Sequence, residues 1–572
     1  MNPHTLNRLT RTAALLAATF APVIPVLAQA NLPTPRPPGG MRFLGTAGFI
    51  DYDRGVAPTS APLFPLVLWS GDQMEPPEAL MPGELQGRPV DINWPLLDAV
   101  DLGAVTHCAF PLIGGESREL VFVRKETFTD RQYNWYGQIA GIPASDFILS
   151  RYEDAIVLQV RDYDRKERFT VRYAPPIGTL PARSTLVLNG DDAEPNWCAT
   201  GSAAAGLPPA NGDGDGGGEP GGNGDGGVGI MSAADPTNVV DVLFVTTNEL
   251  LNFFSSNQAQ INAHAQFLVS EFNVTSSNSN AGVAMRIAGV LRGNYNENAS
   301  GSNDLTNLAN AANGLQATPS MRSMVRADHV CLLRRNTWPS ATGGTVYGVA
   351  YVPSSLNEAA QSSHGFSVVA AVSGNFGSTF SHEIGHNFGA CHDAATNASA
   401  NTCTSSVTTS PHGKRWSCNR VACTDHWHTT MAYGNNTNAC SASTRVPFFS
   451  NPALTYVTPA GCSNFVLGDS ISNVANLIQT TRSRVSQWQI GSSRQWTLST
   501  YGGVGNGTYY APFNRVASAA SAVQGGTEGE VYISSGTYNE TAAAGRSVIF
   551  SSPCVMTVVA GPASNSGPAL LR

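Results

Sequence analysis

Two histidines and a glutamate in one short stretch are the residues best suited to chemistry. His382, Glu383 and His386 follow a His-Glu-x-x-His pattern. On a helix, residues four apart lie on the same face, so the two imidazoles can reach one tetrahedral metal ion, and zinc is the expected ion. Glu383 stands beside the first ligand and can reach a water molecule on that ion, which is the position of a general base.

A glycine and a third histidine extend this pattern. Gly389 can adopt the left-handed conformation that ends a helix, so the chain can turn back and bring His392 to the same ion. The alternative is an amphipathic helix whose histidines fall four apart by coincidence. A set of three histidines, a glutamate, a glycine and an aspartate at this fixed spacing is very rare by chance, which argues against coincidence. The sequence therefore predicts a three-histidine zinc site.

The extended stretch resembles the signature of the metzincin zinc endopeptidases, which is followed in the chain by a methionine turn. Asp393, directly after the third histidine, is similar to the reprolysin (adamalysin) branch, and Met431 resembles the residue of the methionine turn. The resemblance implies an α/β (α+β) domain with a mixed sheet and a long active-site helix. It also implies that a zinc-activated water, with Glu383 as the base, hydrolyses peptide bonds in protein or peptide substrates.

The same resemblance assigns roles to residues outside the signature. Gly348, Val349 and Ala350 look like the edge strand that pairs with an extended substrate, with an ordinary sheet strand as the alternative. Tyr433 stands where astacins and serralysins carry a tyrosine, so it is either a catalytic helper or a packed aromatic. Residues 446–452 lie at the position in the chain where such enzymes form the wall of the pocket for the substrate residue that flanks the scissile bond. The alternative is a packed loop.

Composition and the first residues bear on localisation. The chain has 572 residues, 13% charged residues and a net charge of -8, which argues against a nucleic-acid surface and favours a loop-rich extracellular protein. Residues 1–30 combine a basic start, an apolar run and a small-x-small site, as in a secretory signal peptide. A membrane anchor is the alternative, but the run is short and contains Pro22 and Pro25. We expect a secreted, extracellular protein without a membrane segment after signal cleavage.

Ten cysteines in an exported chain favour disulfide bonds. Seven of them surround the histidine motif, and because seven is odd, at least one is free or pairs outside the set, with Cys554 as a candidate. These seven are Cys331, Cys391, Cys403, Cys418, Cys423, Cys440 and Cys462.

Residues 31–205 form a β-rich segment in which short apolar runs alternate with turns, for example at 119–123 and 155–160. The runs at 135–141 and 146–150 resemble the propeptide of reprolysins, which implies a zymogen inhibited by its own propeptide. Cys198, near the end of this segment, is a possible latency thiol, since a thiolate can take the place of the catalytic water on zinc. The alternative is a disulfide with Cys108.

The remaining chain divides into three parts. Residues 206–235 form a Gly/Asp-rich linker, where maturation cleavage would be easiest. A calcium-binding glycine-aspartate repeat is the alternative there, but its nonapeptide does not recur, so calcium is possible but unsupported. Residues 236–490 form the zinc protease domain, and residues 491–572 a small β-rich module that looks like the opening coil of a parallel β-helix.

The pattern within the protease domain is one of alternating strands and helices. We expect strands at 239–245, 284–290, 328–333 and 366–372, a helix at 257–272, the ligand helix from Ser378 and a closing helix at 469–489.

Two functions from different classes fit this sequence. The first is a secreted zinc metalloendopeptidase made as a zymogen. The second is a secreted adhesin or binding protein on an inactive zincin scaffold. Degenerate scaffolds lose the glutamate or a ligand, whereas all four residues are present here. The sequence therefore favours the protease.

Overall fold

The computed structural model describes two long stretches of the chain and several short segments. The long stretches are residues 56–189, with gaps at 72, 77–79, 82–83, 102–105, 130, 164 and 179, and residues 238–488, with gaps at 326, 340–344, 357–361, 372–375, 397–402, 404, 420–423, 435–442, 457–463 and 487. The short segments are residues 494–497, 513–522, 529–533, 548–551 and 570–571. The predicted signal peptide, Cys198 and the linker lie outside the described residues. No helix in the described part of the chain is both long and apolar enough to cross a membrane.

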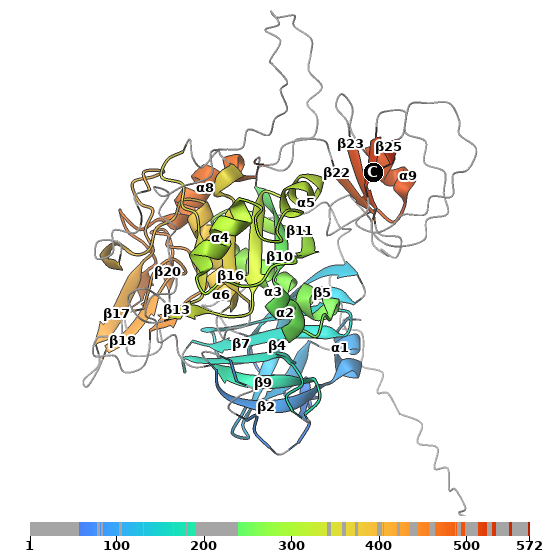
Figure 1. Cartoon of the computed structure of the whole chain (residues 1–572). Coiled ribbons are helices and arrows are strands. Elements are labelled where there is room, and N and C mark those ends of the chain that lie inside the picture. Colours follow the sequence, from blue (N-terminus) through green and yellow to red (C-terminus); the bar gives the residue numbers. More distant parts are fainter. Residues whose placement is uncertain are drawn as a thin grey trace, which may run out of the picture. The chain divides into compact units, whose positions relative to one another are not determined.

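The described residues of the N-terminal region form a nine-stranded antiparallel sheet, drawn in blue to cyan in Figure 1. Its strands follow the order β1-β2-β9-β8-β7-β6-β5-β4-β3. They are β1 (Val67–Trp69), β2 (Glu84–Ile92), β3 (His107–Pro111), β4 (Ser117–Thr129), β5 (Gln132–Ile139), β6 (Ser145–Tyr152), β7 (Ala155–Asp162), β8 (Glu167–Ala174) and β9 (Arg183–Asn189), with helix α1 at Trp94–Asp101. The sheet agrees with the β-rich composition predicted for this region.

Both faces of the central strands are covered, which is why β6 and β7 contain long runs of buried residues. Phe147 and Leu158 face a core that the sheet makes together with helix α1. Ile148 and Val157 belong to a second core, which they share with Phe272 of helix α3 (Gln258–Asn278). Because neighbouring residues of a strand point to opposite faces, one face of this sheet packs on α3.

A five-stranded sheet forms the centre of the second described stretch (Figure 1). Its order is β11-β10-β12-β16-β15, in which β15 at the edge runs antiparallel to β16 and the other neighbours pair in parallel. The strands are β10 (Val239–Thr246), β11 (Ala284–Arg292), β12 (His329–Arg334), β15 (Gly348–Ala350) and β16 (Phe366–Ala370). The predicted strands are therefore confirmed, with their ends displaced by one or two residues.

The helices of this stretch are α2 (Asn248–Phe253), α3, α4 (Gly301–Ala309), α5 (Thr318–Val325), α6 (Phe376–Asn387) and α8 (Val474–Val485). Asn257 caps α3 by accepting hydrogen bonds from two backbone amides, and the helix runs six residues beyond its predicted end at residue 272. The predicted closing helix at 469–489 is wrong at both ends. The side chain of Asn473 caps α8, and the residues before it form a turn in which Asp469 and Ser472 exchange backbone hydrogen bonds.

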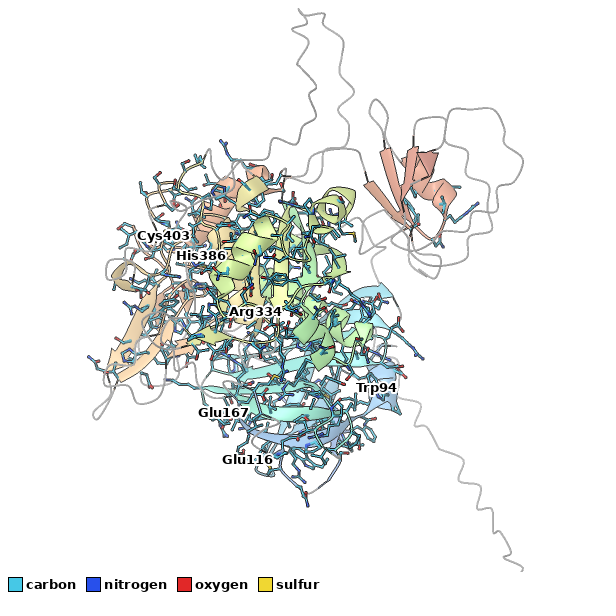
Figure 2. The ribbon with its side chains drawn as sticks, in the orientation of Figure 1. Trp94, Glu116, Glu167, Arg334, His386 and Cys403 are labelled. Atoms are coloured by element: carbon cyan, nitrogen blue, oxygen red, sulfur yellow. A yellow bond between two sulfur atoms is a disulfide. The ribbon has the colours of Figure 1, made fainter. Side chains whose placement is uncertain are left out.

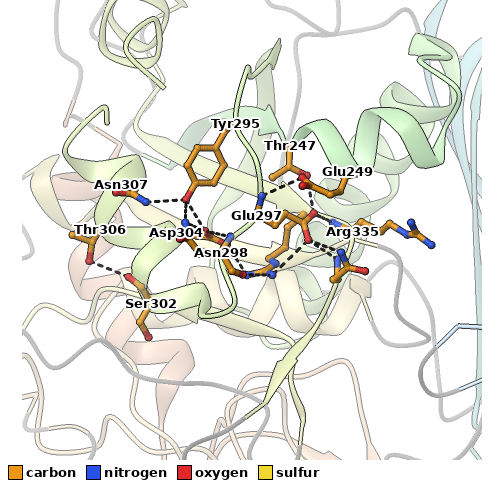
Figure 3. Close-up of polar contacts among 12 residues, drawn as sticks. Thr247, Glu249, Tyr295, Glu297, Asn298, Ser302, Asp304, Thr306, Asn307 and Arg335 are labelled. Carbon is orange, nitrogen blue, oxygen red and sulfur yellow. Dashed lines mark hydrogen bonds and ion pairs between the residues drawn. The ribbon is translucent and has the colours of Figure 1, made fainter. Parts of the chain in front are cut away.

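A polar network holds α4 against the carboxyl ends of β10 and β12 (Figure 3). Asp304 accepts hydrogen bonds from the hydroxyl of Tyr295 at 2.6 Å and from Arg334 at 2.5 Å. Glu297 accepts from the hydroxyl of Thr247 at 2.8 Å and from the backbone amide of Asn336 at 3.1 Å. Hydrogen-bond donors of the protein thus contact the carboxylates of both Asp304 and Glu297. These two acidic residues therefore add no support for a calcium site.

Shorter strands complete the described chain. They are β13 (Trp338–Pro339), β14 (Thr345–Val346), β17 (Arg415–Asn419), β18 (Thr424–His428), β19 (Thr444–Arg445), β20 (Thr455–Tyr456) and β21 (Phe465–Val466). The C-terminal segments are β22 (Arg494–Thr497), helix α9 (Val516–Ala522), β23 (Gly529–Ile533), β24 (Val548–Ser551) and β25 (Leu570–Leu571). These four C-terminal strands pair in parallel in chain order. The β-helix-like module stays a prediction.

Candidate metal centre

Helix α6 carries the first two histidines of the signature and is buried on all sides. Phe380 and Ile384 anchor one face of it in the hydrophobic core. The helix ends where Gly389 takes a φ of 100°, the left-handed conformation that the sequence predicts at this position. The amide of Gly389 donates to the carbonyl of His386 at 2.8 Å, so the chain reverses within three residues and brings His392 back towards the helix.

The three imidazoles converge on one point. Nε2 of His386 lies 3.1 Å from Nε2 of His382 and 3.1 Å from Nε2 of His392. Two nitrogen ligands at 2.0–2.1 Å from a tetrahedral zinc ion would be about 3.3 Å apart. Among the residues that the structure describes, the ligand atoms of these three histidines all lie within 4.8 Å of one another, close enough to hold one metal ion. The spacing of the donor atoms therefore fits zinc.

Hydrogen bonds and burial prepare the histidines as ligands. Nδ1 of His382 donates to the carbonyl of Thr430, and Nδ1 of His386 donates to the carbonyl of Ala390, both at 2.7 Å. Because a carbonyl only accepts, the proton is on Nδ1 and the Nε2 lone pair faces the centre. Burial lowers the pKa of His386 to about 4. Burial, followed by the neighbouring imidazoles, lowers the pKa of His382 and of His392 as well. All three are neutral at pH 7.

Glu383 lies fully buried between α6 and the edge strand β15. A Cβ atom added to Gly348 would stand 2.2 Å from Oε1 of Glu383, closer than real Cβ contacts allow. Glycine at this position therefore makes room for the carboxylate. The sequence reasoning assigned Gly348 to substrate binding and missed this role, because no local pattern links residues 348 and 383.

Met431 lies under the same helix. A Cβ atom added to Gly385 would stand 2.3 Å from Sδ of Met431, so the methionine fills the space beneath the residue between the two helical histidines. Thr430 directly precedes Met431, and its carbonyl accepts the hydrogen bond from Nδ1 of His382. The 429–431 segment thus supplies both an apolar floor and a hydrogen-bond anchor for the histidines.

Residues 236–443 match the family model described as metallo-peptidase family M12. This region is an M12 metallopeptidase domain. The predicted resemblance to the metzincin zinc endopeptidases is confirmed at the level of this domain.

The M12 domain also has curated relatives. Peptidyl-Asp metalloendopeptidases of Stenotrophomonas maltophilia are 30% identical over 235 residues in strain K279a and over 236 residues in strain R551-3, covering 40% of this chain and 49% of each relative. The enzyme of the same name from Xanthomonas campestris pv. campestris is 27% identical over 231 residues, 39% of this chain and 46% of its own length. The chain spans about half the length of the curated relatives it matches. A solved "Structure of a chaperone-substrate complex" overlaps at a TM-score of 0.30 and 19% identity, over 44% of this chain and 35% of that one, too little to bear on the fold.

Asp393 ties the third histidine of the M12 domain to the methionine turn. Its Oδ2 accepts from the amide of Tyr433 at 3.2 Å and from the hydroxyl of Thr396 at 2.7 Å. Its Oδ1 pairs with Arg415 at 2.7 Å. The ring of Tyr433 packs against the imidazole of His392, with centroids 4.4 Å apart. Sequence reasoning singled out Asp393 and Tyr433 but missed Arg415, which lies on a strand with no motif.

The strand β15 borders the site on the side of Glu383. Gly348, Val349 and Ala350 pair with β16 and occupy the edge of the described sheet. An edge position is what the predicted pairing with a substrate requires.

One disulfide bond supports the turn before the third histidine. Cys391 is bonded to Cys403, with Cα atoms 5.6 Å apart. Figure 2 labels Cys403 and the ligand His386. Cys331 is a free buried thiol, in agreement with the odd cysteine count. Cys108 is also free and buried, so the alternative disulfide between Cys108 and Cys198 is wrong. That alternative required Cys108 to be oxidised, whereas Cys108 is a thiol enclosed in the core of the nine-stranded sheet. Burial raises the pKa of Cys331 to about 12 and that of Cys108 further, which makes both unsuitable as thiolate ligands.

Proposed function

We propose that this chain is a zinc-dependent endopeptidase that hydrolyses peptide bonds in proteins. The observation that carries the proposal is the convergence of His382, His386 and His392, beside the buried carboxylate of Glu383, within an M12 domain. When bound by these histidines, a zinc ion supplies a Lewis acid that polarises the scissile carbonyl and lowers the pKa of water towards about 7.

The residues of the chain take the remaining roles. Glu383 is the general base that accepts a proton from the attacking water and then donates it to the departing amine, a contribution of about a hundred- to ten-thousandfold. The backbone of residues 348–350 holds the substrate in an extended conformation. Tyr433, packed on His392, either helps to stabilise the developing oxyanion or only positions the imidazole. A Tyr433→Phe variant separates these roles, because loss of turnover with unchanged zinc content indicates the catalytic one.

We propose that the enzyme is secreted after removal of residues 1–30 and made as a zymogen. Residues 31–205 would be the propeptide and inhibitor, with cleavage in the linker at 206–235 and Cys198 as the possible latency thiol. The contacts of the nine-stranded sheet with α3 support a folded N-terminal partner for the M12 domain. Mass spectrometry of the secreted product would give the cleavage sites, and a mature protein that begins before residue 190 would contradict this assignment.

The relatives named peptidyl-Asp metalloendopeptidases suggest the substrate preference. We propose that this enzyme also cleaves next to aspartate. A cleavage profile on a digest of denatured proteins, read by mass spectrometry, tests the preference directly.

The adhesin or binding protein remains the second candidate, and one experiment separates it from the protease. The secreted protein is purified after cleavage in the linker at 206–235 and incubated with casein, with and without a zinc chelator. We expect cleavage that the chelator abolishes. Glu383→Gln should retain zinc and lose at least about a hundredfold in turnover, whereas His386→Ala should lose the metal in elemental analysis. Full activity of Glu383→Gln, or cleavage that resists the chelator, would contradict the proposal.

A further inference from the structure

The third histidine, His392, lies outside helix α6, which ends at Asn387. Nδ1 of the His392 imidazole is buried and has no hydrogen-bond partner among the residues that the structure describes. The two helical histidines differ, since Nδ1 of His382 and Nδ1 of His386 each donate to a backbone carbonyl. Metal-bound histidines are usually oriented through this second ring nitrogen. The position of the His392 imidazole therefore depends on ring packing and on the contacts that hold its backbone.

The segment at residues 411–414 holds the backbone of this ligand. The amide of Cys391 donates to the carbonyl of Pro411 at 2.8 Å, and the amide of Gly413 donates to the carbonyl of Cys391 at 3.3 Å. Between these two hydrogen bonds, Nδ1 of His412 lies 2.8 Å from the carbonyl oxygen of His392. Because a carbonyl only accepts, Nδ1 of His412 carries the proton and donates it to this oxygen.

The backbone of His412 is itself fixed on two sides. Its amide donates to the carbonyl of Ile471 at 3.3 Å, in the turn before α8. Its carbonyl accepts from the hydroxyl of Ser450 at 2.7 Å. The imidazole of His412 thus projects from an anchored backbone, which is what a residue that positions another side chain requires.

The same segment contacts the methionine turn. The amide of Lys414 donates to the hydroxyl of Thr429, and the amide of Thr429 donates to the carbonyl of Lys414, both at 2.9 Å. A Cβ atom added to Gly413 would stand 2.5 Å from the amide nitrogen of Ala432, so the two backbones are in direct contact. The 411–414 segment therefore joins the backbone of the third histidine to the turn whose Thr430 carbonyl orients the first.

We propose that His412 is a positioning residue of the metal centre, whose imidazole holds the carbonyl of His392 and thereby sets the direction from which the third ligand reaches the zinc ion. This inference rests on the proposed zinc-dependent function and gives a role to a histidine outside the signature. The ring of His412 is half-buried, so its hydrogen bond to His392, more than core packing, is what a substitution removes.

Three substitutions isolate that hydrogen bond. His412→Asn keeps a donor in the same place, because the amide nitrogen of asparagine is bonded to Cγ, as Nδ1 of histidine is. His412→Gln moves the donor one bond further from the backbone, and His412→Leu removes it while keeping an apolar side chain of similar width. The asparagine and glutamine variants differ in where the donor stands and share the same amide chemistry.

The test is zinc affinity of the full chain, measured by competition with a chelator in a Glu383→Gln background that prevents self-cleavage. His412→Leu should lower the affinity by about ten- to a hundredfold, the usual effect of removing a group that orients a metal ligand. His412→Gln should lie close to His412→Leu, whereas His412→Asn should stay within about threefold of the parent protein. Co²⁺ binds the same nitrogen ligands, and its visible absorption should change in the Leu variant and be restored in the Asn variant.

A matched control and a stability measurement separate positioning from a merely structural role. His107→Leu removes another half-buried histidine whose Nδ1 is hydrogen-bonded, to Glu119 at 2.6 Å, and should leave zinc affinity within about twofold. If His412 only supports folding, all three His412 variants should lower the urea midpoint of the zinc-free protein. The zinc affinity of the folded form and the Co²⁺ spectrum would then stay unchanged, and this result would overturn the proposal.

The outcomes distinguish this inference from the function on which it rests. Equal zinc affinities of His412→Asn and His412→Gln would overturn the role of His412 even if His412→Leu does not fold. Wild-type protein that binds zinc but does not cleave casein would overturn the proposed protease, while the zinc affinities of the variants still decide the role of His412. Wild-type protein that binds no zinc would overturn both.

Discussion

Replacing Arg161 should destabilise the chain more than any surface substitution, because this residue joins the N-terminal sheet to the M12 domain. Its guanidinium contacts Asp146 of β6, with Nε 2.5 Å from Oδ1 and Nη2 3.0 Å from Oδ2, and also pairs with Glu271 of α3. Exposed fractions are 6% for Arg161, 0% for Asp146 and 1% for Glu271. Burial alone would lower the pKa of Arg161, but the two carboxylates more than offset it and raise that pKa, so the guanidinium stays charged.

The magnitude follows from the charges left behind. Arg161→Met would leave two carboxylates buried side by side, and removing one partner of a buried ion pair costs about 3–5 kcal/mol. With a urea m-value of about 3 kcal/mol/M, the unfolding midpoint should fall by about 1–1.7 M. Replacing Arg161, Asp146 and Glu271 together by apolar residues should recover most of this loss, because no buried charge then remains.

The assay is urea unfolding of the full chain in a Glu383→Gln background, which prevents self-cleavage. Arg131→Met is the matched control, because Arg131 pairs with Asp154 at 3.7 Å and both side chains are more than half exposed, 59% and 83%. Its midpoint should move by no more than about 0.3 M. If Arg161→Met unfolds at the wild-type midpoint, the proposed role of the buried triad is wrong.

Three further predictions concern the site and its helices. Gly348→Ala should keep zinc in elemental analysis but lower kcat at least about tenfold, because the added methyl displaces Glu383; unchanged kcat would contradict the contact. Gly385→Ala should lower the free energy of unfolding by about 1–3 kcal/mol in thermal melts, since the methyl collides with Met431, and an unchanged melting temperature would count against that packing. Burial lowers the pKa of His264 to about 3, so the unfolded chain takes up a proton that the native state refuses, and stability falls as pH drops below about 6.5. His264→Leu should remove about 2 kcal/mol of the loss between pH 7 and pH 5, and equal losses in both proteins would refute this.

The local part of the metal centre could be predicted from the sequence because short-range geometry determines it. The spacing of His382 and His386 places both on one face of a helix, and Gly389 is the residue that can end that helix with a positive φ. The strands of the central sheet were also predictable, since strands buried on both faces contain uninterrupted apolar runs.

What the sequence did not reveal depends on contacts between distant segments. The space that Gly348 leaves for Glu383 and the packing of Met431 under Gly385 both arise from how separate elements meet. No periodicity or local motif encodes such contacts. The start of α8 differs, because Asn473 is a recognisable cap directly before an apolar residue and could have corrected the predicted helix.

The contacts of the N-terminal sheet bear on how a propeptide could act on this site. Those that the structure describes include α3, through Glu271, and the β17–β18 hairpin, through the ion pair of Lys166 with Asp425 at 3.0 Å. Helix α3 in turn packs against the first turn of α6, where a Cβ atom on Gly377 would stand 2.7 Å from the ring of Phe267. If the sheet only blocks the site, weakening its attachment should increase activity. If the sheet supports α3, weakening its attachment should lower the retention of zinc. The Arg161→Met variant therefore also distinguishes these two roles of the sheet. We expect the variant to lose zinc at a lower chelator concentration than the wild type. A gain in casein cleavage without loss of zinc would show that the sheet does not support the site.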